Sequence, residues 1–269
     1  MCQFDVCYID PPWQFANRRV IRKDGGRARF GMGAVNHYGV LADEIIKALP
    51  LASVMAPRSV VFCWGSYAKA KIALESIEAW GFRVSTIGFQ WIKLNTRVAQ
   101  LPLVDKRQRG LVSDLLDRDL DGFLDHLTFF GTGHWAKANS EPCWLGVRGS
   151  PALPVVDNTV SSIVYAPVSK HSAKPPEVAR RIVQMFGPDR RYLEVFARLD
   201  SPGSGLPGWT ATGLEYDGLD VFDALKMFAS LEVSNDYTYR VLAQPYGESA
   251  FPPHWRSPKA GAAPVGLLC

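Results

Sequence analysis

The sequence has few cysteines and no pattern that would use them together. Five cysteines occur in 269 residues, their number is odd, and no Cys-x-x-Cys is present. The five histidines show no spacing typical of metal ligands. These absences argue against a disulfide-stabilised fold and a structural zinc site, so we expect reduced thiols and no bound metal.

Long apolar runs are also missing. No stretch reaches the roughly 18 consecutive apolar residues of a membrane-spanning helix, so we expect no membrane association. Residues 1–5 lack the basic and apolar regions of a secretion signal, which predicts a cytoplasmic protein. The net charge of +4 permits binding to nucleic acid without requiring it.

Strand-like and helix-like patterns alternate along the chain. Continuous apolar runs predict strands buried on both faces at residues 4–10, 59–65, 86–93, 142–147, 162–165, 192–196 and 210–215. Apolar residues at helical spacing predict helices at 43–55, 67–80 and 176–186. This alternation indicates an α/β fold with a mostly parallel sheet flanked by helices.

Three segments depart from this alternation. Residues 16–36 hold six basic residues and one acid, which predicts a cationic loop. Residues 97–130 are interpreted as an insertion ending in an amphipathic helix that covers a sheet edge, pairs with another subunit or acts as a lid. We therefore predict one large domain at 1–218 that contains this insertion, and a C-terminal helix followed by a partly disordered tail at 219–269.

The stretch Asp10-Pro11-Pro12-Trp13 directly follows the first predicted strand. A carboxylate and a carbonyl pre-aimed by proline are suitable acceptors for the two N–H groups of an exocyclic amine. Trp13 would stack against the nucleobase that carries this amine. The position after a strand also fits, because ligand sites of α/β sheets lie at the carboxyl ends of strands. The alternative is a proline-stiffened turn with a buried tryptophan.

At this point the sequence resembles the N6-adenine methyltransferases, which include the mRNA adenosine methyltransferase catalytic subunit and bacterial and phage DNA-modifying enzymes. Beyond residues 10–13, seven blocks follow in family order: HYGVLADEI (37–45), VVFCWG (60–65), WGFRVSTIGFQWIK (80–93), GTGHWAKANSEPCWLGVRG (131–149), HSAKPPEVARRI (171–182), YLEVFAR (192–198) and GWTATGLE (208–215).

The resemblance implies a Rossmann-like fold with permuted motif order and S-adenosyl-L-methionine as methyl donor. It implies that Asp10 to Trp13 are catalytic and that Tyr38 and Glu141 line the substrate site. Lys174 would reach toward the methionine carboxylate or the target adenine. Asp10 and Lys174 would also border the cofactor, together with four residues near the last two predicted strands: Glu194, Phe196, Arg198 and Glu215. Leu214 departs from the family, which usually has an amide there.

The proposed substrate is adenine in DNA, with RNA as the alternative. Arg18, Arg19 and Arg22 are expected to contact phosphates next to the target base, and Lys93 belongs to a secondary basic cluster. A non-catalytic nucleic-acid-binding subunit is a further alternative. The resemblance also suggests a homodimer or a related partner subunit. It further suggests a protein that is bacterial, or encoded by a phage and made in a bacterial host.

Overall fold

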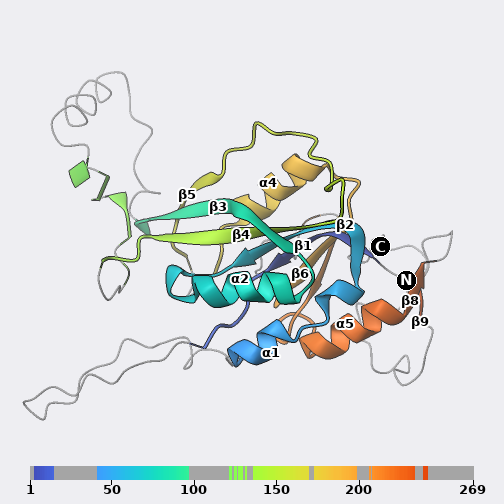
Figure 1. Ribbon diagram of the computed structural model, residues 1–269. Helices are drawn as coiled ribbons and strands as arrows, with labels where there is room; N and C mark the ends of the chain where they lie inside the picture. The colour runs from blue at the N-terminus through green and yellow to red at the C-terminus, as the bar shows by residue number, and fades with distance from the viewer. Residues whose placement is uncertain are drawn as a thin grey trace, which may run out of the picture.

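A central sheet organises the part of the chain that the computed structural model describes. The described residues are 3–14, 41–96, 121–122, 124–125, 127–129, 131, 136–169, 173–198, 206, 208–233 and 239–241. Within them, seven strands form one sheet in the order β5-β3-β4-β2-β1-β6-β7 (Figure 1). No helix in these ranges is long and apolar enough to cross a membrane.

The strands confirm the predicted positions with shifted ends. They are β1 (Phe4–Ile9), β2 (Met55–Trp64), β3 (Arg83–Leu94), β4 (Ser140–Arg148), β5 (Ile163–Pro167), β6 (Tyr192–Val195) and β7 (Trp209–Thr212). Only β4 runs antiparallel to its neighbours, β2 and β3. A separate antiparallel pair consists of β8 (Leu231–Val233) and β9 (Tyr239–Val241).

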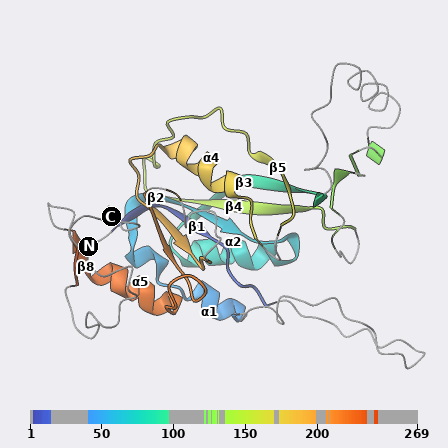
Figure 2. The same cartoon turned by 180° about the vertical axis from the view of Figure 1, so that it is seen from behind.

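Helices cover both faces of the sheet. The helices α1 (Asp43–Lys47), α2 (Ala70–Ala79) and α5 (Val221–Ser230) lie on one face, and α4 (Pro176–Phe186) lies on the other (Figures 1 and 2). The helix predicted at 43–55 is instead α1 followed by a short 3-10 helix, Leu51–Ser53. Pro50 lies between the two, and a proline interrupts the helical hydrogen-bond pattern because it has no N–H.

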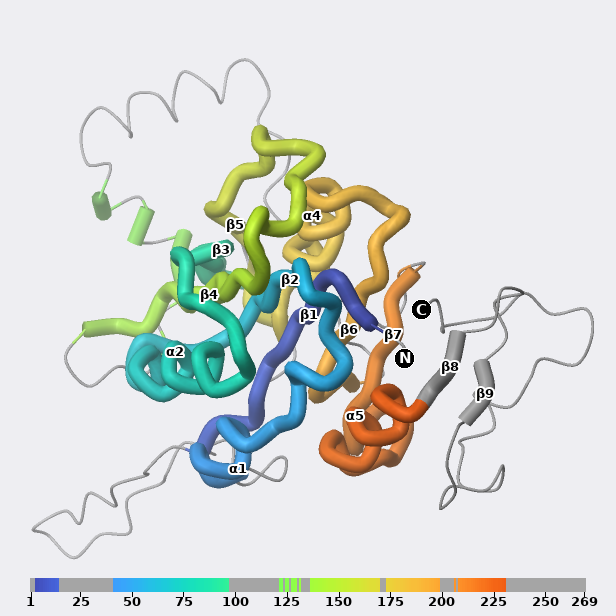
Figure 3. The backbone as a smooth tube through the Cα atoms, turned by 45° about the vertical axis from the view of Figure 1, so that its right-hand side comes forward, coloured from blue at the N-terminus to red at the C-terminus, as the bar shows by residue number. Residues whose placement is uncertain are grey.

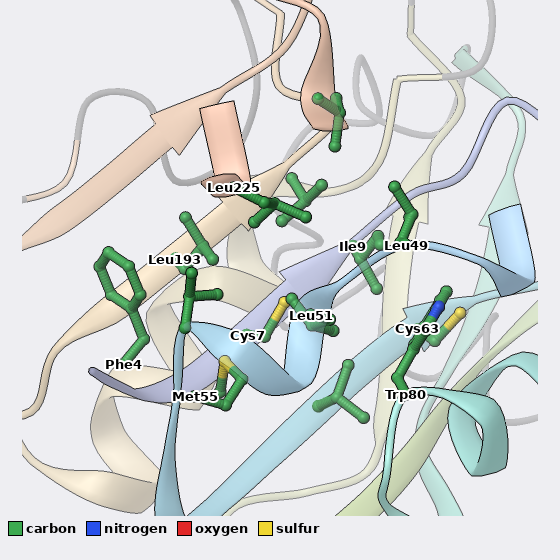
Figure 4. Packing of buried hydrophobic residues seen from close by; sticks show 14 of the residues in the cluster. Phe4, Cys7, Ile9, Leu49, Leu51, Met55, Cys63, Trp80, Leu193 and Leu225 are labelled. Carbon is green, nitrogen blue, oxygen red and sulfur yellow. The ribbon is translucent and has the colours of Figure 1, made fainter. Parts of the chain in front are cut away.

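Alternate residues of the central strand β1 supply both cores. Cys7 and Ile9 pack toward α1 and α5, whereas Val6 and Tyr8 pack toward α4. All four are almost completely buried, as the continuous apolar run predicts for a strand covered on both faces. Figure 4 shows the first of these cores, to which Phe4, Leu193 and Leu225 of α5 all belong.

The helix α5 lies beyond the predicted domain boundary at residue 218. Its residues Val221, Leu225 and Phe228 nevertheless belong to the same core as β1 and β6. The ring of Phe228 makes an edge-on contact with Phe4, with centroids 5.8 Å apart. The tube drawing likewise places α5 beside β7 and α1 (Figure 3). The described structure therefore shows no separation at 218, although the boundary itself stays a prediction.

Candidate active site

Residues from four elements meet at one edge of the sheet. Asp10 follows β1, Trp64 ends β2, and Lys174 lies just before α4. Glu141 joins them because β4 is antiparallel, so that the beginning of this strand lies beside the ends of its neighbours. This is the carboxyl edge of the parallel strands, where open α/β sheets bind ligands.

Lys174 connects the two acids of this edge. Its Nζ lies 3.1 Å from Oδ1 of Asp10 and 3.3 Å from Oε1 of Glu141. The other carboxylate oxygen of Glu141 lies 2.7 Å from Nζ of Lys93, at the end of β3. The lysine side chain is 5% exposed and that of Asp10 is 26% exposed, so one end of the charged cluster remains accessible.

Burial and charge set the ionisation of this cluster. Burial raises the pKa of Asp10 above its ordinary value; Lys174 opposes this shift and Glu141 adds to it. Burial would likewise raise the pKa of Glu141, but the charges of Lys174 and Lys93 outweigh it and the pKa is lowered. Burial would lower the pKa of Lys174, yet the two carboxylates raise it well above its ordinary value. The lysine is therefore fully charged at neutral pH.

Trp64 lies against Lys174 of this cluster, and the sequence did not single it out as a site residue. Its ring centre lies 5.5 Å from Nζ of Lys174, within cation–π range. Its indole N–H donates to the hydroxyl of Tyr8, 2.7 Å away, and its carbonyl accepts from the indole N–H of Trp13 at 2.9 Å. The block VVFCWG contains Trp64, but its partners are far away in the sequence and no local pattern indicates them.

The Asp-Pro-Pro-Trp corner is tied to its surroundings by its backbone. The carbonyl of Pro11 accepts from the N–H of Trp13 at 2.8 Å, and the carbonyl of Pro12 accepts from Leu41 at 3.0 Å. A carbonyl can accept two hydrogen bonds, so Pro11 retains capacity for a second donor. Its predicted contact with a substrate amine stays a prediction.

Trp13 differs from the expected open stacking face. It is 5% exposed and belongs to the core shared with α1 and α5. This burial and the hydrogen bond to Trp64 give the indole a structural role. The position of Trp13 therefore fits the alternative interpretation, a buried tryptophan in a proline-stiffened turn. Burial of the ring is the physical reason that it offers no broad face to a base in this structure.

The other end of the site lies where β6 and β7 end. Glu194 is 3% exposed, and its charge contributes to the raised pKa of both Tyr8 and Tyr216 after the larger effect of burial. Phe196, just beyond β6, has a φ of 62°, which is strained for a bulky residue. Such strain is typical of functional turns, where the surrounding structure over-determines the backbone.

Glycine at position 213 allows the ends of β6 and β7 to approach closely. A Cβ there would lie 2.4 Å from the carbonyl oxygen and 2.6 Å from the nitrogen of Ala197. Across this contact the N–H of Ala197 donates to Thr212 at 2.8 Å, and Arg198 and Glu215 form a short parallel bridge. The structure therefore brings two of the predicted cofactor residues, Arg198 and Glu215, together. Leu214, which precedes Glu215 in the chain, is 74% exposed.

The chemistry of these residues suits the cofactor that the resemblance implies. S-adenosyl-L-methionine carries ribose hydroxyls, an ammonium group and a carboxylate. Glu194 is a buried acceptor suited to hydroxyls, Asp10 is an anion suited to the ammonium group, and Lys174 is a point charge suited to the carboxylate. The donor set thus fits this cofactor.

Several predicted site residues lie outside the described part of the chain. These are Tyr38, Arg18, Arg19 and Arg22, and their roles stay predictions. The sequence analysis assigned Lys93 to a basic cluster; in the structure its ammonium group forms an ion pair with Glu141. In the described ranges, no group of three or more His, Cys, Asp or Glu residues is arranged to hold a metal ion. The three described cysteines, Cys7, Cys63 and Cys143, are free and buried.

Comparison with known proteins finds relatives that are named as N6-adenosine or N6-adenine methyltransferases. A rice protein (Oryza sativa subsp. japonica), named probable N(6)-adenosine-methyltransferase MT-A70-like, is 25% identical over 222 residues, covering 82% of this chain and 24% of its own length. Human N(6)-adenine-specific methyltransferase METTL4 is 27% identical over 232 residues, covering 83% and 40%. The human N(6)-adenosine-methyltransferase catalytic subunit METTL3 is 24% identical over 222 residues, covering 82% and 30%.

The chain thus spans between 24% and 40% of the length of these relatives. The family model described as MT-A70 matches residues 4–110 and 124–215, which contain every strand of the seven-stranded sheet and the whole Asp10–Lys174–Glu141 cluster. With its sheet, its charged edge and this match in agreement, the chain belongs to the MT-A70 family.

Proposed function

We propose that this protein transfers a methyl group from S-adenosyl-L-methionine to the N6 amino group of adenine in DNA. The observation that carries the proposal is the buried ion-pair cluster of Asp10, Lys174 and Glu141 at the carboxyl edge of the sheet. A carboxylate paired with a lysine at this position, beside the strand that bears Glu194, suits an amine substrate next to a methyl donor.

The chemistry requires orientation more than proton abstraction. The lone pair of the adenine amine is delocalised into the ring, which makes the amine a poor nucleophile. Asp10 would accept one of its N–H groups and Pro11 the other, which aims the lone pair out of the ring. Lys174, in direct contact at 3.1 Å, opposes the effect of burial and so favours the ionised form of Asp10. No strong base is needed before the transfer, because the methylated amine is cationic and very acidic, and Asp10 would take its proton afterwards.

Residues of both ends of the site would hold the cofactor. Glu194 would accept hydrogen bonds from ribose hydroxyls, while Asp10 and Lys174 would face the methionine part. The turn formed by Phe196, Arg198 and Glu215 would border the nucleoside. When bound, S-adenosyl-L-methionine supplies an electrophilic methyl group on its sulfonium.

Nucleic acid is the substrate class that the relatives' names support. The names of the rice protein and of METTL3 specify adenosine, and that of METTL4 specifies adenine. Adenosine is a ribonucleoside, so RNA is the second candidate. DNA is preferred because the sequence also resembles bacterial and phage DNA-modifying enzymes. An adenine in duplex DNA would have to flip out of the stack, and the cationic segment 16–36 directly follows the catalytic corner and is suited to grip nearby phosphates. A homodimer or a related subunit is part of the same proposal.

Methyl incorporation tests the proposal. Single-stranded DNA, double-stranded DNA and RNA of one sequence would be incubated with labelled S-adenosyl-L-methionine and analysed for N6-methyladenine. We expect the DNA to be labelled faster, and Asp10→Asn to lower the rate about a hundredfold or more. Asp223→Asn, on the exposed face of α5, is the matched control and should keep the rate.

Three outcomes would overturn different parts of the proposal. An unchanged rate in Asp10→Asn removes the assigned role of the carboxylate. Faster labelling of RNA corrects the substrate. Cofactor binding without transfer to any of the three oligonucleotides favours a non-catalytic subunit.

A further inference from the structure

Lys93 is joined to the active-site cluster across two neighbouring strands. On β3, Trp91 lies directly opposite Glu141 of β4, and Lys93 lies two residues further along the same face. This diagonal position lets Nζ of Lys93 reach Oε2 of Glu141 at 2.7 Å, shorter than either contact of Lys174 with its two acids. The ammonium group also lies 5.0 Å from the ring centre of Trp91.

The contacts arrange four charges in alternation. Asp10 meets Lys174, Lys174 meets Glu141, and Glu141 meets Lys93. With all four ionised, the two negative and two positive charges cancel. Without Lys93, two carboxylates would share the single charge of Lys174 in a largely buried setting, and one of them would tend to take up a proton.

The two acids already differ in the direction that this arrangement requires. Glu141 contacts two lysines and its pKa is lowered, whereas Asp10 contacts one of them and its pKa is raised by burial. Burial is the largest single effect on both acids, and Lys93 adds to the effect of Lys174 in lowering the pKa of Glu141. The side chain of Lys93 is 19% exposed and that of Glu141 14%, which leaves little solvent to screen the pair.

We propose that Lys93 is a positioning residue that keeps Glu141 ionised and within reach of Lys174, so that Lys174 in turn holds Asp10 as an ionised acceptor. This inference rests on the proposed methyl transfer and adds a residue that touches neither the substrate nor the cofactor. It also gives Lys93 a different role from phosphate contact, which would leave Glu141 with one lysine.

Kinetics of three variants test the proposal. Lys93→Met removes the charge and should lower kcat about ten- to a hundredfold while KM for the oligonucleotide changes little. Lys93→Arg restores a cation and should recover most of kcat. Lys71→Met is the matched control, because Lys71 is 91% exposed and its ammonium group lies 3.7 Å from the carboxylate of Glu75, away from the site; it should leave both constants unchanged.

The pH profile gives a readout that a purely structural role would not move. Loss of Lys93 should shift the acid limb of kcat upward by about one pH unit, because Glu141 and Asp10 then compete for Lys174. The charged and titratable groups near Glu141 and Asp10 come from separate elements. Besides Asp10 itself, which follows β1, they are Lys93 from β3, Cys143 from β4, Lys174 before α4 and Arg198 after β6. Arg198 and Lys174 remain in the variant, so the shift reports Lys93.

An increase in KM with a weaker salt dependence, and with kcat and the acid limb unchanged, would identify Lys93 as a nucleic-acid contact and overturn the proposal. A carbon-13 NMR titration of Glu141 separates this failure from failure of the proposed function, because it needs no activity. The pKa of Glu141 should lie below that of an ordinary glutamate in the unsubstituted protein and should be higher in Lys93→Met. If that variant does not fold, Lys93→Gln serves in its place. A titration of the unsubstituted protein at or above the ordinary value also overturns the proposal.

Discussion

The hydrogen bond between Trp64 and Tyr8 is expected to contribute to stability because no water can replace either partner. Tyr8 is 1% exposed and Trp64 is fully buried, and the N···O distance is 2.7 Å. Tyr8→Phe keeps the ring and its edge-on contact with Trp64, in which the ring centroids lie 6.5 Å apart, but it removes the hydroxyl that accepts from the indole N–H. A buried donor left without a partner costs about 1–3 kcal/mol, and we expect a loss of this size in the free energy of unfolding.

A double-mutant cycle separates the hydrogen bond from packing. Trp64→Phe alone should cost more than Tyr8→Phe, because it also removes ring volume and the cation–π contact with Lys174. The double variant lacks both polar groups and should cost less than the sum, by about 1–2 kcal/mol. Urea unfolding followed by far-ultraviolet circular dichroism measures all three variants without relying on tryptophan fluorescence.

Tyr67→Phe is the matched control. It removes the same hydroxyl from a residue that is 57% exposed, where the hydroxyl donates to Gln90 at 3.0 Å. Water can replace that contact, so the expected change is within about 0.5 kcal/mol. The reasoning is refuted if Tyr8→Phe is as mild as this control, or if the two core substitutions are additive.

Two further predictions concern the two ends of the site. Gly213→Ala places a Cβ 2.4 Å from the carbonyl oxygen of Ala197 and should cost about 1–3 kcal/mol in stability and weaken S-adenosyl-L-methionine binding in calorimetry. Gly218→Ala meets no atom within 4 Å of its Cβ; its φ of 75° strains an alanine and lowers stability, but binding should be unchanged. Glu141→Gln should destabilise the protein at neutral pH. Because the folded pKa of Glu141 is lowered, its ionised form stabilises the fold above about pH 4.3, and this contribution is lost as the pH falls through the lowered value. The stability difference between Glu141→Gln and the unsubstituted protein, measured by urea unfolding from about pH 6 to about pH 3, should therefore shrink; a constant difference contradicts it.

Local patterns in the sequence were sufficient to place the strands. Continuous apolar runs mark β1, β2 and β6 because each is covered on both faces. The ends were less predictable: β7 ends at Thr212, before the predicted 215, because Gly213 begins the turn that meets Ala197. The direction of β4 also leaves no local trace, since a buried strand has the same pattern whether it runs parallel or antiparallel.

Site residues could be predicted from the sequence only where the residues that act together are neighbours along the chain. Asp10 follows a strand and precedes two prolines, a combination that stands out within four residues. Lys93 and Trp64 act through partners 48 and 110 positions away along the chain, Glu141 and Lys174, and such contacts arise from strand order. No single-sequence pattern specifies strand order, so their roles emerge only from the fold.

The register between β1 and β6 determines whether the two ends of the site share one face. Tyr8 pairs with Glu194 and Ile9 with Val195, which places the glutamate on the α4 side of the sheet. A slip of one residue would turn Glu194 into the apolar core beneath α5. At the opposite end of these strands, the carboxylate of Asp5 accepts from the backbone N–H of Arg191 at 3.0 Å and from its Nε at 3.4 Å. The N–H of Asp5 in turn donates to the carbonyl of Arg191 at 2.9 Å. Because this reciprocal pairing occurs where the strands begin, a polar contact remote from the site helps to set the register that brings Glu194 beside the strand leading to Asp10.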